Sequence, residues 1–110
     1  MRVILDECVP RPLNRYLLSH DVTTVQERGW AGLKNGPLLL RMREASVEAF
    51  VTTDRSLEYQ QTLAGAGFAV VVLVAASNTL EDLLRLVPTL LTAMERTLPG
   101  QVTHVPSDSP

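Results

Sequence analysis

The feature that most constrains the fold of this chain is the run FAVVVLV at residues 68–74. Its length and its β-branched residues are typical of a strand, and its apolar residues are continuous rather than alternating with polar ones. Such a strand must be covered on both faces, which is characteristic of a parallel sheet between helices. Similar shorter runs at residues 2–5 and 49–53, and a weaker run at 21–25, predict three further strands.

Apolar residues at helical spacing lie between these runs. One such segment follows Pro10 and Pro12, and a second begins near Asn35, which is expected to cap it. The longest pattern covers residues 79–97 and contains Pro88, where we expect a kink or a break. Strands that alternate with helices in this way predict right-handed βαβ units in a doubly wound α/β fold.

The size and composition of the chain fit one domain. Its 110 residues are 45% hydrophobic, which is sufficient for a core. We assign residues 1–98 to this domain and 99–110 to a tail, in which 101–105 is expected to form an edge strand before the end becomes disordered. The single cysteine, Cys8, excludes an internal disulfide and a thiolate metal cage. The acidic pair in MRVILDECV and the lack of a long apolar segment predict a cytoplasmic protein outside the membrane.

Acidic residues follow two of the predicted strands. Asp6 comes directly after the first strand, Asp54 comes after the run at residues 49–53, and Glu7 is next to Asp6. In an open parallel sheet, ligands bind outside the carboxyl ends of the strands at the point where the strand order reverses. Carboxylates that meet there repel one another and favour a bound cation. The sequence therefore predicts a shared site for Mg²⁺ or Mn²⁺.

Each of these residues also has a structural interpretation. An aspartate just past a strand often caps a helix or closes a turn, and Asn35 can act as a helix cap alone. Lys34 and Arg55 can be solvated loop charges. Trp30 is expected to anchor a loop on the sheet, and His104 to be an isolated surface residue.

Four segments together resemble a known family. They are LDECVP at residues 5–10, TVQERGWAGLKNG at 24–36, VTTD at 51–54 and LEYQQ at 57–61. The pattern, which spans about residues 1–95, is similar to the short PIN-like domain proteins, relatives of PIN ribonucleases and VapC-type toxins. The resemblance implies a three-layer α/β/α sandwich with a mostly parallel sheet of four or five strands. It also implies metal-dependent cleavage of RNA, with a cognate antitoxin and a homodimer among the expected partners.

The resemblance also indicates site residues. Three acids match catalytic and metal-binding positions of the family: Asp6, Glu7 and Asp54. Asn35 stands where many relatives carry an acid and would be a further metal ligand. Because an amide oxygen brings no negative charge, this pattern predicts weaker Mg²⁺ binding, which Asn35→Asp would strengthen. Glu44 or Glu48, later in the same segment, would take the place of the missing acid if they face the site.

The charge of the chain limits how RNA would be held. The formal net charge of −2 excludes a protein that coats nucleic acid, because neutralising phosphates requires a basic surface. We therefore expect only a local basic rim to orient the phosphate backbone, formed by Lys34, Arg55 and Arg11.

Two other functions fit parts of the same pattern. The chain could be a non-catalytic PIN-like module that binds another protein. It could also be a phosphoacceptor receiver domain, which likewise has an acidic pair after its first strand and an aspartate after its third. Receivers need a lysine at the end of the fifth strand, whereas the only lysine here is Lys34.

Overall fold

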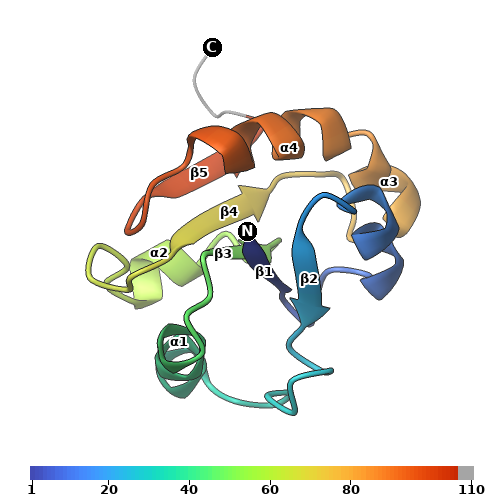
Figure 1. The fold of residues 1–110 in the computed structure, drawn as a ribbon. Helices are drawn as coiled ribbons and strands as arrows, with labels where there is room; N and C mark the ends of the chain where they lie inside the picture. The colour runs from blue at the N-terminus through green and yellow to red at the C-terminus, as the bar shows by residue number, and fades with distance from the viewer. Residues whose placement is uncertain (107–110) are drawn as a thin grey trace.

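The computed structural model describes residues 1–106 and contains one five-stranded sheet in which all neighbouring strands are parallel. The strand order is β2-β1-β3-β4-β5 (Figure 1). The strands are β1 (Arg2–Leu5), β2 (Asp21–Thr24), β3 (Ala49–Thr52), β4 (Ala69–Leu73) and β5 (Val102–Val105). The predicted parallel α/β fold is therefore confirmed, including the edge strand near the C-terminus.

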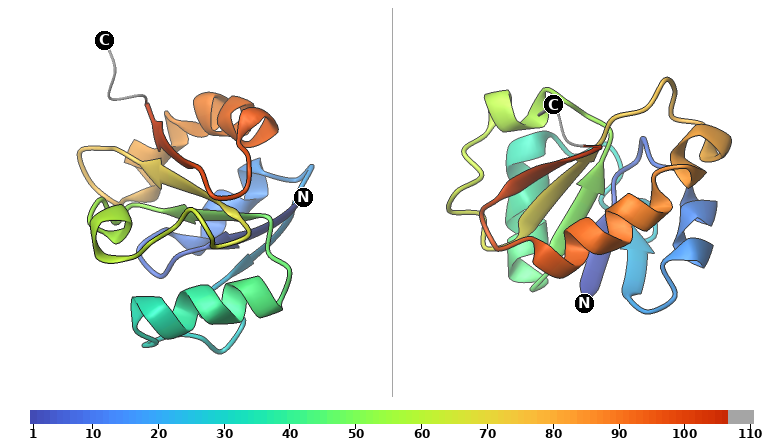
Figure 2. Two further views of the ribbon diagram at one scale, coloured as in Figure 1. Left: turned by 90° about the vertical axis from the view of Figure 1, so that its left-hand side faces the viewer. Right: turned by 90° about the horizontal axis from the view of Figure 1, so that it is seen from above.

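Helices cover both faces of the sheet and make three layers (Figure 2). One face is covered by the 3₁₀ helix η1 (Arg11–Tyr16), α3 (Leu80–Leu84) and α4 (Val87–Arg96). The other is covered by α1 (Asn35–Glu44) and α2 (Leu57–Gln60). Within residues 1–106, none of these helices has the length and apolar character needed to cross a membrane.

The central strands bury side chains on both faces, as their continuous apolar sequences predict. In β3, Phe50 belongs to the apolar cluster that contains Leu38 and Met42 of α1. Its neighbour Val51 belongs to the opposite cluster, which contains Leu90 of α4. Full burial of side chains of this size contributes about 1.5–3 kcal/mol each. The two clusters therefore hold the helices on both faces of the sheet.

The first helical segment forms a 3₁₀ helix rather than an α-helix. Leu13 N donates to Pro10 O at 3.0 Å, and Leu17 N donates to Asn14 O at 3.1 Å. Pro12 has no N–H group, and Leu13 is the buried residue of this helix. A helix this short, with a single buried side chain, is typical of the 3₁₀ form.

The predicted break in the third helical segment is confirmed. α3 ends at Leu84 and α4 begins at Val87, so that Pro88 lies in the first turn of α4. In one continuous helix, the ring of Pro88 would clash with the carbonyl group of Leu84. In the first turn of a helix its missing N–H group has no cost. Thr79 caps α3 by accepting a hydrogen bond from Asp82 N at 3.3 Å.

His104 attaches β5 to α2, so the expectation of an isolated surface histidine is wrong. Its Nε2 atom lies 2.7 Å from Glu58 Oε1, and both side chains are 22% exposed. α2 was not predicted, because a helix of four residues is too short to show apolar spacing. The disorder expected at the end of the tail concerns residues 107–110, which lie outside the described residues.

The turn before β5 requires a glycine at position 100. Gly100 has a φ of 83°, in the left-handed region. A Cβ atom at this position would lie 2.5 Å from the carbonyl oxygen of Ala64. The Gly100 N–H group donates to Phe68 O at 2.9 Å, which fixes the chain as it enters β5.

Gly100→Ala is expected to lower the free energy of unfolding by at least about 2 kcal/mol, because backbone strain adds to the contact with Ala64. Gly36→Ala is the matched control, since a Cβ at that position in α1 meets no atom within 4 Å. The control should leave stability unchanged or raise it by up to about 1 kcal/mol. Urea unfolding followed by circular dichroism measures both variants. Equal stability of the two would show that the turn tolerates a side chain.

Candidate functional site

The acids lie at the edge of the sheet where all strands end, which we call the carboxyl edge. β2 and β3 lie on opposite sides of β1, so the strand order reverses between β1 and β3 (Figure 1). Asp6 directly follows β1, and Asp54 follows β3 by two residues. Asp6 N also donates to Val51 O of β3 at 2.9 Å. β1 and β3 are thus neighbours in the sheet, and an aspartate follows each of them.

A buried hydroxyl group links the loops that carry the two aspartates. Thr52 has no exposed surface, and its Oγ1 donates to Asp6 Oδ2 at 2.7 Å. The same oxygen accepts a hydrogen bond from Asp54 N at 3.0 Å. Thr52 was not among the predicted site residues, although its position two residues before Asp54 in VTTD is a signal of this role.

Cys8 is a second residue that contacts both loops and was not among the predicted site residues. Its Sγ lies 3.7 Å from Asp6 Oδ2 and 3.6 Å from Thr52 Oγ1. Thr53 N donates to the sulfur at 3.5 Å. The side chain is partly buried, so the thiol contributes packing and weak polar contacts beneath the loop of Asp6.

Asp54 also closes the turn that leads to α2. Its Oδ1 accepts hydrogen bonds from Ser56 N at 2.9 Å and from Ser56 Oγ at 2.6 Å. The interpretation of Asp54 as a turn residue is therefore confirmed. These bonds use Oδ1, and Oδ2 makes no hydrogen bond with a described residue.

Glu7 does not join the two aspartates. Its Oε1 accepts a hydrogen bond from Gly32 N at 2.8 Å and so holds the loop between β2 and α1. Trp30 in this loop packs partly against the α1-side core, and the Arg28 guanidinium carbon lies 5.6 Å from its ring centroid. The expected role of Trp30 as a loop anchor is confirmed. Within residues 1–106, no three side chains of His, Cys, Asp or Glu lie together as a metal-binding group, so the structure does not contain the predicted three-acid cluster.

Asn35 is connected to Asp54 only through other side chains. Lys34, not Asn35, is the N-cap of α1, so the expected capping role of Asn35 is wrong. Asn35 Nδ2 donates to Gln60 Oε1 at 2.9 Å, and Gln60 Nε2 donates to Ser56 Oγ at 3.2 Å. We call this series, which ends at Asp54, the amide relay.

The two acids expected to take the place of Asn35 do not reach the carboxyl edge. Glu48 precedes β3, and its Oε1 accepts a hydrogen bond from Arg2 N at 2.9 Å at the opposite edge of the sheet. Glu44 is the last residue of α1, and α1 begins near Asp54 and leads back to the start of β3. That expectation is therefore wrong for both residues.

The three basic residues predicted to hold phosphate all lie on segments that follow strand ends. Arg11 begins η1, Lys34 immediately precedes α1, and Arg55 follows Asp54. All three are exposed. Arg11 also forms an ion pair with Glu27 at 3.6 Å, which reduces its charge toward an approaching phosphate. These residues can make a local basic rim but not a continuous basic surface.

The donor set at Asp6 and Asp54 fits a hard divalent cation. Mg²⁺ binds carboxylate oxygens and usually keeps several waters, so one or two protein carboxylates are sufficient. Asp6 Oδ1 accepts one hydrogen bond, from Glu7 N at 2.8 Å, and so retains a second lone pair, and Asp54 Oδ2 accepts none from a described residue. The two aspartates could therefore share a hydrated ion without losing the hydrogen bonds that orient them.

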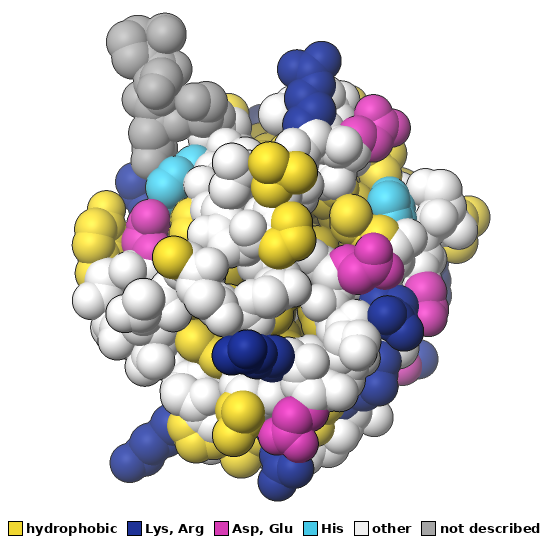
Figure 3. All heavy atoms as spheres, turned by 60° about the vertical axis from the view of Figure 1, so that its left-hand side comes forward, with side chains coloured by type: hydrophobic (Ala, Val, Ile, Leu, Met, Phe, Trp, Pro, Cys, Tyr) yellow, Lys and Arg dark blue, Asp and Glu magenta, His cyan; other side chains and the backbone are white. Residues whose placement is uncertain are grey.

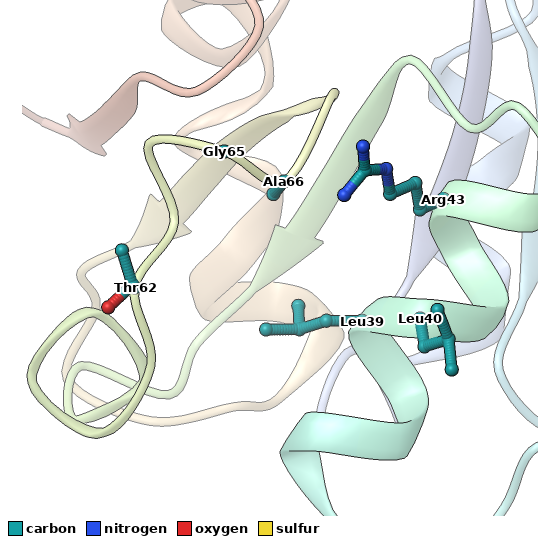
Figure 4. Close-up of a pocket in the computed structure, with 6 residues that line it drawn as sticks. All are labelled: Leu39, Leu40, Arg43, Thr62, Gly65 and Ala66. Atoms are coloured by element: carbon teal, nitrogen blue, oxygen red, sulfur yellow. The ribbon is translucent and has the colours of Figure 1, made fainter.

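A groove elsewhere on the surface is separate from these acids. It lies between α1 and the loop that leads to β4, and its volume is about 290 Å³ (Figure 4). Its lining residues are Leu39, Leu40, Arg43, Thr62, Gly65 and Ala66. None of the predicted site residues lines it, so the candidate site remains at the carboxyl edge.

Comparison of the chain with family models, with curated proteins and with solved structures finds no match. The resemblance to PIN-like proteins therefore rests on the four sequence segments quoted above.

Thr52→Val is expected to lower the free energy of unfolding by about 1–3 kcal/mol, because Asp6 Oδ2 loses a donor and Asp54 N loses its acceptor. Thr103→Val is the control. Its hydroxyl on β5 bonds no other described residue, so the change should stay within about 0.5 kcal/mol. Thermal and urea unfolding measure both variants. A similar small effect in each would show that the Thr52 hydroxyl does not hold the two loops together.

Proposed function

We propose that this protein is a metal-dependent ribonuclease of the PIN-like type, with Asp6 and Asp54 as its central acids. The observation that supports the proposal most is the position of these two aspartates at the reversal of strand order, both bonded to Thr52. Ligand sites of parallel α/β sheets form at this point. The motif resemblance adds the class of substrate, RNA, and the role of toxin in a toxin–antitoxin pair.

In this proposal, Asp6 and Asp54 hold Mg²⁺ or Mn²⁺. The bound ion would lower the pKa of a water molecule and stabilise charge on the scissile phosphate. Thr52 keeps the Asp6 carboxylate oriented, and Ser56 does the same for Asp54. Glu7 assists a second ion only after leaving Gly32, because its carboxylate accepts the N–H group of that residue.

Binding of RNA is expected to be weak and sensitive to salt. On the face shown in Figure 3, basic and acidic side chains are interspersed rather than gathered by sign. The net charge of −2 gives no general attraction for phosphate. Lys34, Arg55 and Arg11 would therefore contact a short stretch of backbone near the cut.

A receiver domain is the second candidate, because the strand order is the one found in flavodoxin-like receivers. A receiver also needs a lysine after its fifth strand. β5 ends at Val105, and the only lysine of the chain is Lys34, which precedes α1. A phosphoryl group on Asp54 would lack this cation, so we favour the ribonuclease. The non-catalytic binding module is the remaining outcome if no cleavage occurs.

Purified protein is expected to cleave single-stranded RNA slowly in the presence of Mn²⁺, and Asp6→Asn should abolish this cleavage, because the ion loses a carboxylate. Asp21→Asn is the matched control, since Asp21 begins β2 at the opposite edge of the sheet and is exposed. Gel analysis of a labelled RNA measures all three proteins. Equal cleavage by wild type and Asp6→Asn would refute the proposed ribonuclease.

Millimolar Mn²⁺ is expected to raise the melting temperature of the wild type. At ten times its dissociation constant, a ligand specific to the folded state stabilises by about 1.4 kcal/mol, which corresponds to roughly 5–10 °C for a domain of this size. Asp54→Asn should lose the response, and Asp21→Asn should keep it. Scanning calorimetry at constant ionic strength measures the shift. The same shift in wild type and Asp54→Asn would place the cation elsewhere.

A further inference from the structure

The amide relay connects α1 to the proposed metal site through hydrogen bonds that are all donated in one direction, from Asn35 toward Asp54. Asn35 Nδ2 donates to Gln60 Oε1 at 2.9 Å, and Gln60 Nε2 donates to Ser56 Oγ at 3.2 Å. Ser56 Oγ then donates to Asp54 Oδ1 at 2.6 Å. A hydroxyl group has one hydrogen, and Gln60 donates to the Ser56 oxygen instead of accepting from it, so the Ser56 hydrogen remains available for Asp54.

The relay also gives α2 an attachment that its packing alone does not provide. α2 has four residues, and Leu57 is its buried one. Gln60 lies at the end of this helix, and its bond to Asn35 joins the helix to the first residue of α1. The turn from Asp54 to Ser56 is therefore held at Leu57, at Glu58 through its bond to β5, and at the relay.

We propose that Asn35 and Gln60 are positioning residues that orient the Asp54 carboxylate through Ser56. This inference deepens the proposed function and rests on Asp54 being a metal ligand there. The amide at position 35 is a donor that the relay requires, and not a weakened substitute for an acidic ligand. The inference thus gives Asn35 and Gln60, which lie outside the pair of aspartates, a role in orienting a proposed metal ligand.

The direction of the relay predicts what an acid at position 35 would do. In Asn35→Asp, the new carboxylate can only accept hydrogen bonds. Gln60 would turn its amide to donate to residue 35, and its carbonyl oxygen would then face Ser56. The Ser56 hydroxyl would donate to Gln60 instead of Asp54, so Asp54 would keep only the bond from Ser56 N.

The test begins with the metal-free protein, so that it does not depend on the proposed function. Carbon-13 NMR measures the side-chain carboxyl resonance of Asp54 in folded wild type, Asn35→Ala, Asn35→Asp and Gln60→Glu. We expect this resonance to move in all three variants, because each interrupts the donors that end at Asp54. Gln61→Glu is the matched control with the same change of charge. Gln61 is next to Gln60 in the sequence, but its side chain is not part of the relay. The Asp54 resonance of this control should therefore stay near its wild-type position.

Binding of Mn²⁺ then tests the link to the metal site. Asn35→Ala is expected to raise the Mn²⁺ dissociation constant by up to about tenfold in titration calorimetry, the lower end of the effect of removing a direct hydrogen-bond partner of a metal ligand, because Asn35 acts through Gln60 and Ser56. An Asp54 resonance that is unchanged in Asn35→Ala and Gln60→Glu would overturn the inference. So would an Asn35→Asp variant that binds Mn²⁺ more tightly with Asp54 unmoved. If the resonance moves but wild type binds no Mn²⁺, the positioning of Asp54 stands and the proposed metal-dependent function falls.

Discussion

Burial of both faces of the parallel sheet is the constraint on which the rest of this structure depends. β3 and β4 have no polar face, so helices must cover both sides. Placing helices on both sides requires the chain to change direction at β1, with β2 on one side and β3 on the other. This reversal brings the loops of Asp6 and Asp54 together. The position of the candidate site is thus a consequence of how the core is covered.

The elements that were predicted correctly each have a clear local signal in the sequence. The strands were predicted because each is a run of apolar or β-branched residues, and the break before α4 because Pro88 cannot continue a helix. α2 and η1 differ from the expectation for the same physical reason. Each buries only one of its side chains, Leu57 or Leu13, so tertiary contacts decide its form.

The candidate site was predicted only as far as backbone position determines it. The positions of Asp6 and Asp54 were predicted correctly from the ends of the strands, because parallel strands end at a common edge of the sheet. The direction of a loop side chain depends on the partners that the fold supplies, which the sequence does not show. Glu7 accordingly binds Gly32 in a loop 25 residues away, instead of joining its neighbour Asp6.

The structural and chemical interpretations of Asp54 are not alternatives. One carboxylate oxygen closes the turn to α2 by accepting two bonds from Ser56, and this fixes the direction of the other oxygen. A residue that a turn holds in place needs less ordering when it binds a cation, because the side-chain entropy has already been lost in folding. The same reasoning applies to Asp6, which Thr52 holds from the buried side. At this edge, the bonds that close the loops also orient the two carboxylates, which would lower the entropic cost of binding the proposed cation.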